Sequence, residues 1–545
     1  MLGIWEGEGR TLFDDVSVSP PRLTPTPQRL FWLPADGNFK LTKEVSIVVS
    51  DGVAGRALTG PRMLAREARE VAGFQPPIVD ESRFKAGRAL HVGTRRARKA
   101  LRGAGLSIPE NPEGYALLVS PDIVAVAGRT ERGPFYGVMT LLQLLARYPS
   151  GPEVLAAKVE DWPDLPLRCT YGLYGGSPII AAEVYARLKL NAVPIESGQF
   201  FDLHRPELRR KWIKAFDILR LHFLEPIPER QSFGHGGNIL SRNPNCAEGI
   251  WVRDERYILK GTKSVALKHL NVLITPSTRI EVRSADGKVL YVEGKDYRVI
   301  PGETKYPFCK DAKPFRIARL PGGRIKDGEE VSVSYDYAPP WVKAYCPNEP
   351  LVYEIMRRAI QGTVRLLRPR YLHIGHDEIW RMKTVSRCIK AGRSNAENLA
   401  ADLLKLLRFA REVDPNVKIM LWADMLNPFH NGLRVHKEDP TAPAADLIPK
   451  EPFIMNVWFY RPGLPTDLGW KSLKWFSEKG FATTGSPWYN ARNAYEWANV
   501  CYIARKQGMP CIGVIYTSWE RKWDALSTLA EYAWRHAPNF RLLSE

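Results

Sequence analysis

Two neighbouring acidic residues, Asp377 and Glu378, are the strongest chemical signal in this sequence. They follow a short apolar run, 371–374, that predicts a strand. Side chains of neighbouring strand residues point to opposite faces, so both acids serve one pocket only where the strand stops and the chain turns. Their charges repel, which a protein tolerates by keeping one acid protonated as a proton donor, or by exposing both on a loop. The apolar lead-in, Gly375 and Trp380 favour a functional pocket.

A repeating pattern of strand, loop and helix from residue 168 onward predicts the scaffold that positions these acids. Helical periodicity is clearest at 351–367 and 396–413. The predicted strands lie at 169–173, 192–195, 223–227, 371–374, 418–421, 454–457, 481–484 and 512–516. Strands in this number that alternate with helices indicate a (β/α)8 TIM barrel, whose active sites lie at the carboxyl ends of the strands.

Polar and aromatic side chains follow several of these predicted strands. The resulting candidate substrate-binding residues are His235, Trp422, Asp424, Trp458, Trp488, Tyr489, Trp519 and Glu520. A single tryptophan at such a position more often only packs, but several that face carboxylates suit a pyranose, whose C–H face stacks on aromatic rings. The pattern therefore predicts a sugar site with Asp377 and Glu378 as its catalytic pair.

The rest of the chain predicts two further parts and a leading segment. Residues 1–22 are expected to be an N-terminal extension, 23–160 a small α/β domain, and 161–545 the barrel. Residues 241–341 interrupt the barrel pattern with Asp-Gly turns and with an alternating segment at 331–337. We expect them to form a β-rich insertion between barrel strands 3 and 4 that leaves and re-enters on the catalytic face, where it could wall the site.

Amino-acid composition limits the kinds of partner that the chain is expected to bind. Lys and Arg total 78 against 59 for Asp and Glu, a net charge of +19, but the basic residues are scattered and form no nucleic-acid motif. We therefore expect no nucleic-acid partner and attribute the charge to solubility or ion pairing. No uncharged apolar run of about 18 residues occurs, which predicts no membrane span. Assembly into a homo-oligomer stays open.

Location and cofactors are constrained more weakly. The N-terminus lacks the basic and then apolar pattern of a signal peptide, so a cytoplasmic location is expected, with secretion left open. The seven cysteines are never spaced C-x-x-C, which argues against a disulfide framework or a zinc site. We expect no cofactor and no metal.

Several segments resemble glycoside hydrolase family 20, chiefly the β-N-acetylhexosaminidases. Residues 373–378 (HIGHDE) are similar to the family signature H-x-G-G-D-E, with His376 in place of the second glycine. Residues 228–235 resemble its P-E-x-x-x-P-G-H segment, with Phe233 in place of the proline. The segment 346–353 and the N-terminal segments 113–115 and 137–143 are also similar to the family. The resemblance thus covers most of the chain.

This resemblance implies a substrate-assisted retaining mechanism, in which the 2-acetamido oxygen of the substrate attacks C1 and forms an oxazolinium ion. Asp377 would orient the acetamide, and Glu378 would protonate the leaving oxygen. His235 would tune Glu378, Tyr489 would bond the acetamide oxygen, and the tryptophans 422, 458 and 519 would enclose its methyl group. The implied substrate is a glycan with a terminal N-acetylhexosamine.

Departures from the family pattern keep alternatives open. The expected arginine after the first strand is missing, and Glu196 is only a candidate for an aspartate after the second. The family's Tyr-x-Asp and Trp-x-Glu segments become Tyr489-Asn490-Ala491 and Trp519-Glu520-Arg521, which alters further contacts to the sugar hydroxyls. A glycan-binding relative without turnover, or one of different specificity, is therefore the second hypothesis. A metal-dependent hydrolase that uses His373, His376 and Asp377 is the third, and it is disfavoured because residues 373 and 376 of a strand face opposite ways.

Overall fold

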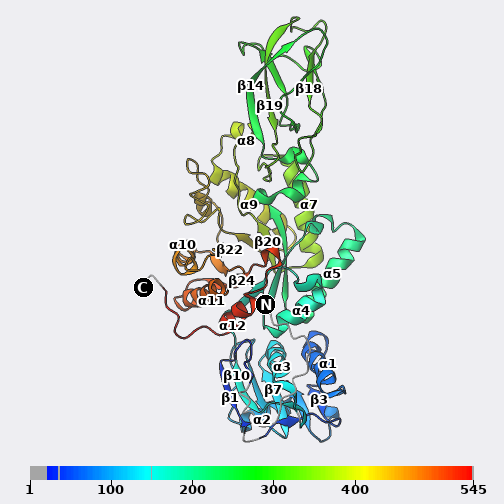
Figure 1. The fold of residues 1–545 in the computed structure, drawn as a ribbon, viewed down its shortest axis with the longest axis vertical. Coiled ribbons are helices and arrows are strands. Elements are labelled where there is room, and N and C mark those ends of the chain that lie inside the picture. The colour runs from blue at the N-terminus through cyan, green and yellow to red at the C-terminus, as the bar shows by residue number, and fades with distance from the viewer. Residues whose placement is uncertain (1–20, 35–36, 149, 543–545) are drawn as a thin grey trace.

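The computed structural model describes residues 21–34, 37–148 and 150–542. Three parts follow one another along its longest axis: an N-terminal α/β part, a closed barrel and a β-rich insertion at the far end (Figure 1). The expected N-terminal extension, residues 1–22, lies outside the described residues except for 21–22. In the described ranges, no helix has the length and apolarity needed to cross a bilayer.

The N-terminal part is a seven-stranded sheet in the order β1-β10-β6-β7-β5-β3-β4, beside a smaller sheet in the order β2-β9-β8. Its strands are β1 (Arg29–Trp32), β2 (Phe39–Lys40), β3 (Ser46–Val49), β4 (Ile78–Asp80), β5 (Ala89–Val92), β6 (Tyr115–Val119), β7 (Ile123–Gly128), β8 (Leu145–Tyr148), β9 (Gly151–Val154) and β10 (Ala157–Asp161). Its helices are α1 (Thr59–Ala72), α2 (Arg95–Gly103) and α3 (Arg132–Leu144). Residues of β6 alternate between two cores, Leu117 with α1 and α3, and Leu118 with α2, so helices cover both faces of the sheet.

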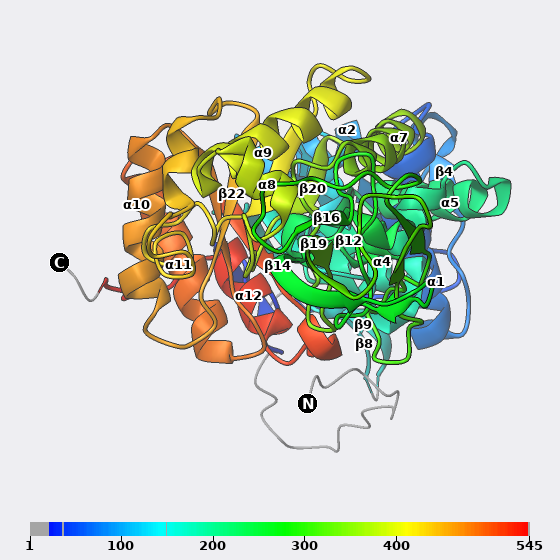
Figure 2. The same cartoon turned by 90° about the horizontal axis from the view of Figure 1, so that it is seen from above.

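A closed barrel of eight strands forms the middle of the molecule, as the alternating pattern predicted. Its strands are β11 (Leu167–Thr170), β12 (Ala192–Glu196), β13 (Glu225–Ser232), β20 (Tyr371–Gly375), β21 (Lys418–Trp422), β22 (Phe453–Trp458), β23 (Ala482–Ser486) and β24 (Cys511–Tyr516). The helices of this part are α4 (Pro178–Arg187), α5 (Pro206–Leu221), α6 (Gly237–Leu240), α7 (Pro350–Leu367), α8 (Ser386–Ala391), α9 (Asn395–Arg411), α10 (Trp470–Glu478), α11 (Ala491–Lys506) and α12 (Leu526–Trp534). Seen from above, helices encircle the strands, with α10 and α11 on one side and α5 and α7 on the other (Figure 2).

Strand β13 is longer than its sequence predicts. The predicted strand ends at residue 227, whereas β13 continues to Ser232. It pairs in parallel with β12 as far as Glu229 and with β20 at Glu229 and Ser232, with a register shift between these two residues. The pairing with β20 therefore carries this segment up to the rim, where His235 follows.

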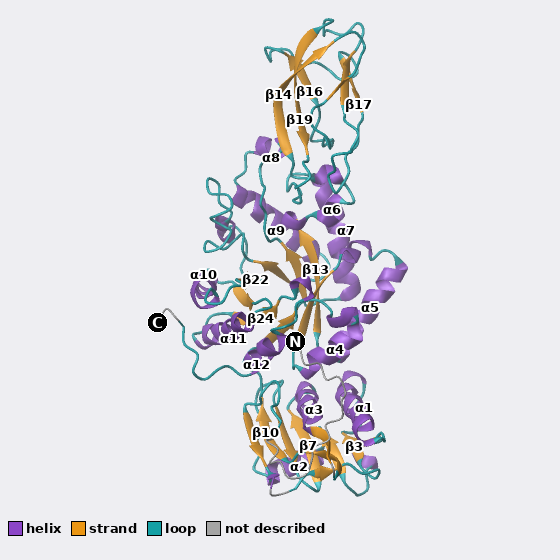
Figure 3. Ribbon diagram, in the orientation of Figure 1, coloured by secondary structure: helices purple, strands orange, loops and turns teal. Residues whose placement is uncertain are grey.

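The β-rich insertion lies between β13 and β20, as expected, and consists of strands and loops (Figure 3). Its strands are β14 (Ile250–Leu259), β15 (Val265–Ala266), β16 (Glu281–Ser284), β17 (Tyr297–Ile300), β18 (Arg316–Arg319) and β19 (Glu329–Tyr337). They form two three-stranded sheets, β14-β19-β16 and β15-β18-β17, around a shared apolar core. The alternation predicted for 331–337 is incomplete, because Asp336 is also buried and bonds the backbone N–H of Ser386 at 2.8 Å. This contact ties the insertion to α8.

Buried ion pairs join the N-terminal part to the underside of the barrel. Lys189 and Asp161 are both fully buried, and their charged atoms are 2.7 Å apart. Arg168 at the start of the barrel bonds Glu113 at 2.7 Å. A charge in such a site is costly to leave unpaired, so these contacts fix how the two parts meet.

Candidate active site

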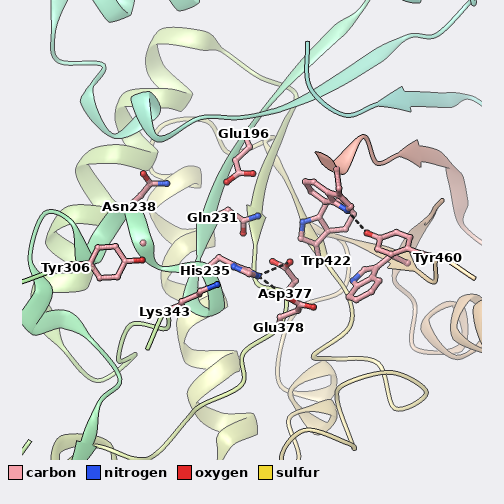
Figure 4. Close-up of a pocket in the computed structure, with 13 residues that line it drawn as sticks. Glu196, Gln231, His235, Asn238, Tyr306, Lys343, Asp377, Glu378, Trp422 and Tyr460 are labelled. Carbon is pink, nitrogen blue, oxygen red and sulfur yellow. Dashed lines mark hydrogen bonds and ion pairs between the residues drawn. The ribbon is translucent and has the colours of Figure 1, made fainter. Parts of the chain in front are cut away.

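A pocket of about 750 Å³ lies at the carboxyl ends of the barrel strands. It is lined by Glu196, Gln231, His235, Gly237, Asn238, Tyr306, Lys343, Asp377, Glu378, Trp422, Trp458, Tyr460 and Trp519. Figure 4 shows the pair Asp377 and Glu378 in the middle, with Trp422 and Tyr460 on one side and Tyr306 and Asn238 on the other. The residues predicted to be catalytic thus lie inside the pocket, at the strand ends that a TIM barrel uses for its sites.

The two acids face one pocket because the chain turns sharply after β20. Gly375, His376 and Glu378 have φ angles of 72°, 72° and 50°. Such left-handed conformations are strained for residues other than glycine and cluster at functional sites. A side chain at Gly375 would also overlap Gln231, since a Cβ atom there would lie 2.3 Å from its Oε1.

The side chain of His376 is turned away from the pocket into the protein. Its Nε2 donates to Asp402 of α9 at 2.8 Å, and its Nδ1 lies 2.6 Å from Ser232 Oγ at the end of β13. His373 lies instead beside Glu229, 3.2 Å from Nδ1 to the carboxylate. The two histidines engage different carboxylates, so this geometry disfavours a metal centre built from both of them with Asp377.

His235 bridges the two acids. Its Nε2 lies 3.4 Å from Asp377 Oδ2 and 3.4 Å from Glu378 Oε2 (Figure 4). Hydrogen bonding to Asp377 and then to Glu378 outweighs burial and raises the pKa of His235 to about 10. His235 is therefore a cation near neutral pH, held between the two carboxylates.

Two further carboxyl groups near the pocket have raised pKa values. Burial raises the pKa of Asp424 to about 7, with a contribution from the charge of Asp377. Asp424 does not line the pocket; it accepts hydrogen bonds from the backbone of Glu378 and from Asn431. Burial and then the charge of Glu229 raise the pKa of Glu196 to about 7. Glu196 is partly exposed to the pocket, yet the surrounding protein is enough for desolvation to be the largest cause of its raised pKa.

Tryptophans from three strand ends form one wall. The rings of Trp422 and Trp519 lie 5.7 Å apart, and Trp458 stacks on Tyr460 at 5.0 Å. Trp519 Nε1 donates to the Tyr460 hydroxyl at 2.8 Å. Because Tyr460 is the acceptor in that bond, its own proton remains available to an acceptor in the pocket. Burial raises the pKa of Tyr460 well above its ordinary value, so this donor persists at high pH.

Besides Asp424, three predicted binding residues lie outside the pocket lining: Trp488, Tyr489 and Glu520. Tyr489 is 44% exposed and is not among the pocket-lining residues, because the turn after β23 carries it outward. Trp488 packs behind the wall, where its Nε1 donates to the carbonyl of Trp519 at 3.1 Å. The side chain of Glu520 is exposed and pairs with Lys522 at 2.6 Å.

The sequence interpretation missed Tyr460 and the side of the pocket opposite the tryptophans. Tyr460 follows Trp458 by two residues, and this spacing along a strand end was a usable signal. Tyr306 belongs to the insertion, and Lys343 lies two residues after the insertion ends. The insertion therefore does contribute to the wall of the pocket, but no local pattern marks which of its residues reach there.

Two groups of side chains in the described residues are close enough to bind a metal. One is His235, Asp377 and Glu378 in the pocket. The other is Glu248, Cys346 and Cys388, buried at the base of the insertion. Cys346 Sγ lies 2.8 Å from Cys388 Sγ. These two cysteines are far apart in sequence, so the spacing of cysteines along the chain did not predict that they meet.

The comparisons agree with this architecture. The family model described as glycosyl hydrolase family 20, domain 2, matches residues 20–162. A chitobiase from Flavobacterium johnsoniae superposes with a TM-score of 0.58 at 16% identity, over 94% of this chain and 69% of that one. A β-N-acetylhexosaminidase from Streptomyces coelicolor A3(2) gives a TM-score of 0.58 at 15% identity, over 95% and 92%.

A third structure is similar over the same range. It is an exo β-N-acetylglucosaminidase from Vibrio harveyi in complex with N-acetylglucosamine, with a TM-score of 0.59 at 12% identity, over 95% of this chain and 74% of that one. At such identities the superpositions establish the fold. The resemblance to glycoside hydrolase family 20 is thus confirmed: the N-terminal part matches that family's domain 2, and the chain as a whole has the fold of its β-N-acetylhexosaminidases.

Proposed function

We propose that this protein is a retaining β-N-acetylhexosaminidase that uses the substrate's own acetamide as nucleophile. The observation that carries the proposal is the closeness of the two acids. One carboxylate oxygen of Asp377, one of Glu378 and a ring nitrogen of His235 all lie within 4.8 Å of one another. An inverting glycosidase needs its carboxyl groups about 6.5–9.5 Å apart, with water between them.

Closeness also argues against a carboxylate nucleophile. In an ordinary retaining enzyme, the acid and the nucleophile stand on opposite sides of the anomeric carbon, about 5–5.5 Å apart. Asp377 and Glu378 are consecutive residues of one turn, and His235 bridges them from one side. The nucleophile then has to come from elsewhere, and a 2-acetamido group on the sugar supplies it.

Each member of the triad His235, Asp377 and Glu378 has a role in this reaction. Glu378, the more exposed acid, protonates the leaving oxygen and later takes a proton from water. Asp377 accepts the acetamide N–H and offsets the positive charge that develops on the oxazolinium ring. His235, whose Nε2 lies 3.4 Å from an oxygen of each acid, tunes Glu378 by holding both carboxyl groups in place and offsetting their charge.

The aromatic wall suits the acetamide group. Trp422, Trp458 and Trp519 provide apolar surface for its methyl group. The Tyr460 hydroxyl, whose proton is not used by Trp519, is placed to donate to the acetamide oxygen. We therefore assign to Tyr460 the role that the family resemblance implied for Tyr489.

Recognition of the sugar hydroxyls is expected to be weak. Arg168 is buried beneath the barrel and bonds Glu113, so it does not serve the pocket. Glu196 is the one acid of the pocket outside the triad and is the candidate for a hydroxyl contact. No arginine of the described residues lines the pocket, and a site without such a partner for a hydroxyl discriminates little between its epimers. The gluco and galacto N-acetyl sugars should be cleaved with similar efficiency.

Three nitrophenyl glycosides test the proposal: the β-N-acetylglucosaminide, the β-N-acetylgalactosaminide and the plain β-glucoside. Release of nitrophenol from both N-acetyl sugars, with the glucoside inert, is the expected result. Efficient cleavage of the glucoside would contradict substrate assistance. Binding of the N-acetyl sugars without any release would instead identify a glycan-binding relative that lacks turnover.

A further inference from the structure

Two cations near the pocket lack acidic partners. Lys343 lines the pocket, and Arg381 follows Glu378 by three residues. Within the described part of the chain, neither side chain has a carboxylate oxygen within 4.0 Å, the limit for an ion pair. The guanidinium of Arg381 lies over the ring of Trp341 instead, 4.4 Å from its centroid.

These cations belong to one surface, which we call the basic rim: Trp341, Lys343, Trp380 and Arg381. Val342 is buried, whereas Trp341 and Lys343 on either side of it are exposed, so their side chains face outward together. The contact between Arg381 and Trp341 joins this segment to the one that follows Glu378. Trp341 and Trp380 are 48% and 58% exposed, which is unusual for the largest apolar side chain.

The position of the rim relates it to the leaving group. In Figure 4, Lys343 lies on the same side of Glu378 as Tyr306, opposite Trp422 and Tyr460. In the proposed reaction the acetamide lies against the tryptophans and Glu378 protonates the leaving oxygen. The sugar that leaves therefore extends past Glu378 toward Lys343 and Tyr306.

We propose that the basic rim binds an acidic sugar, one that carries a carboxylate or a sulfate, on the leaving-group side of the cleaved bond. The inference rests on the proposed function and adds the substrate class. Asp377, Glu378 and Glu196 in the pocket repel an anion, so an acidic leaving sugar needs a cation beyond them. The fork of Arg381 fits a carboxylate or sulfate, and exposed tryptophan rings stack on sugars.

The overall positive charge of the chain does not by itself explain why a lysine of the basic rim lines the pocket. The chain has a net charge of +19, but most of its cations lie outside the pocket. Lys343 is the only lysine or arginine among the pocket-lining residues of the described chain. No carboxylate of the described residues lies within 4.0 Å of its ammonium group, so its charge is free to meet an anion in the pocket.

Matched disaccharides test the inference. N-acetylglucosamine is β-linked either to glucose, to glucuronic acid or to 6-sulfoglucose, and kcat/KM is measured for each. We expect the two acidic disaccharides to be preferred by roughly three- to tenfold at low salt, the scale of one or two exposed charge pairs. The preference should shrink as ionic strength rises.

Variants assign the preference to the rim. Lys343→Met should lower the ratio of acidic to neutral kcat/KM toward one, and Lys343→Arg should retain most of it. Lys288→Met is the control, because Lys288 is 83% exposed in the insertion and pairs with Asp286. It should keep the wild-type ratio. A ratio near one in the wild-type enzyme, or a ratio that Lys343→Met leaves intact, overturns the inference while the proposed function stands.

A binding measurement distinguishes failure of the basic-rim inference from failure of the proposed function. If none of the disaccharides is cleaved, the proposed hydrolase activity fails, and calorimetric titration of the same three disaccharides then decides about the rim. Tighter binding of the acidic ones that Lys343→Met abolishes supports the rim. Equal binding of acidic and neutral disaccharides overturns it.

Discussion

The carboxylate of Asp424 accepts a hydrogen bond from the backbone N–H of Glu378 at 3.0 Å. Asp424 follows β21 and Glu378 follows the neighbouring β20, so the bond links two adjacent strand ends. It holds Glu378 in its left-handed conformation. Asp424 thus positions the acid from behind, although sequence reasoning placed it among the groups that touch substrate.

Replacing Glu378 with Gln should harm substrates with poor leaving groups most. An amide cannot donate the proton that an alkoxide needs, whereas a nitrophenolate leaves without one. We expect a loss of roughly 10²–10⁴ in kcat/KM for a disaccharide and a smaller loss for the nitrophenyl glycoside. Steady-state kinetics on both substrates check this, and equal losses would remove Glu378 from the acid role.

Asp377→Asn should slow hydrolysis of all N-acetyl substrates by about 10²–10⁴. The neutral amide cannot offset the charge of the oxazolinium ion or fix the acetamide N–H. Asp286→Asn, in an exposed turn of the insertion, is a control that should keep full activity. A folded Asp377→Asn enzyme with normal kcat would show that the acetamide does not depend on this residue.

His235 should make the stability of the fold depend on pH. The pKa of its ring is raised from an ordinary 6.5 to about 10 by hydrogen bonding to Asp377 and Glu378. A raised folded-state pKa means that the protonated ring stabilises the fold. This contribution is complete below about pH 6.5 and is lost as the pH rises toward 10.

The variant His235→Asn cannot carry that charge. Its Tm should therefore lie below the wild-type Tm by more at pH 6 than at pH 10, as measured by thermal unfolding in matched buffers. The two proteins share all their other titrating groups, so the effects of those groups on Tm cancel when the two Tm values are subtracted. A Tm difference that is the same at both pH values would show that His235 gains no proton affinity on folding.

Tyr460→Phe and Tyr489→Phe form a matched pair. Tyr460 lines the pocket, whereas Tyr489 is exposed outside it. Loss of the Tyr460 hydroxyl should lower kcat/KM for N-acetyl sugars by about tenfold or more, the scale of one lost hydrogen bond to a charge that develops in the reaction. Tyr489→Phe should have little effect, and the reverse result would return the acetamide contact to Tyr489.

Lys189→Met should destabilise the junction between the N-terminal part and the barrel. It leaves the Asp161 carboxylate buried without its cation, which costs about 3–5 kcal/mol in comparable sites. Lys471→Met, which breaks an exposed pair with Asp467, should cost no more than about 1 kcal/mol. Denaturant unfolding measures both, and similar small losses would mean that Asp161 is satisfied by its other donors.

Local patterns were enough to predict the barrel and to place Asp377 and Glu378 at its pocket. Apolar runs such as 371–374 become strands because both faces of a parallel sheet are buried, and the acids that follow the fourth strand lie at the rim. The extension of β13 to Ser232 escaped prediction because pairing with β20, far away in sequence, decides it. Tyr306 and Lys343 escaped for the same reason, since the path of a long insertion depends on contacts between distant segments.

The insertion stands apart from Asp377 and Glu378, the acids of the proposed reaction. Its residue Tyr306 and the adjoining Lys343 meet the pocket, while Asp377 and Glu378 are held by barrel elements. It has its own apolar core and is joined to the barrel by bonds at its ends, such as that between Asp336 and Ser386. Sequence change in it can therefore accumulate without disturbing the catalytic turn. Such a chain could acquire new glycan preferences by exchanging one module, and grafting insertions between relatives is a route to redesign them.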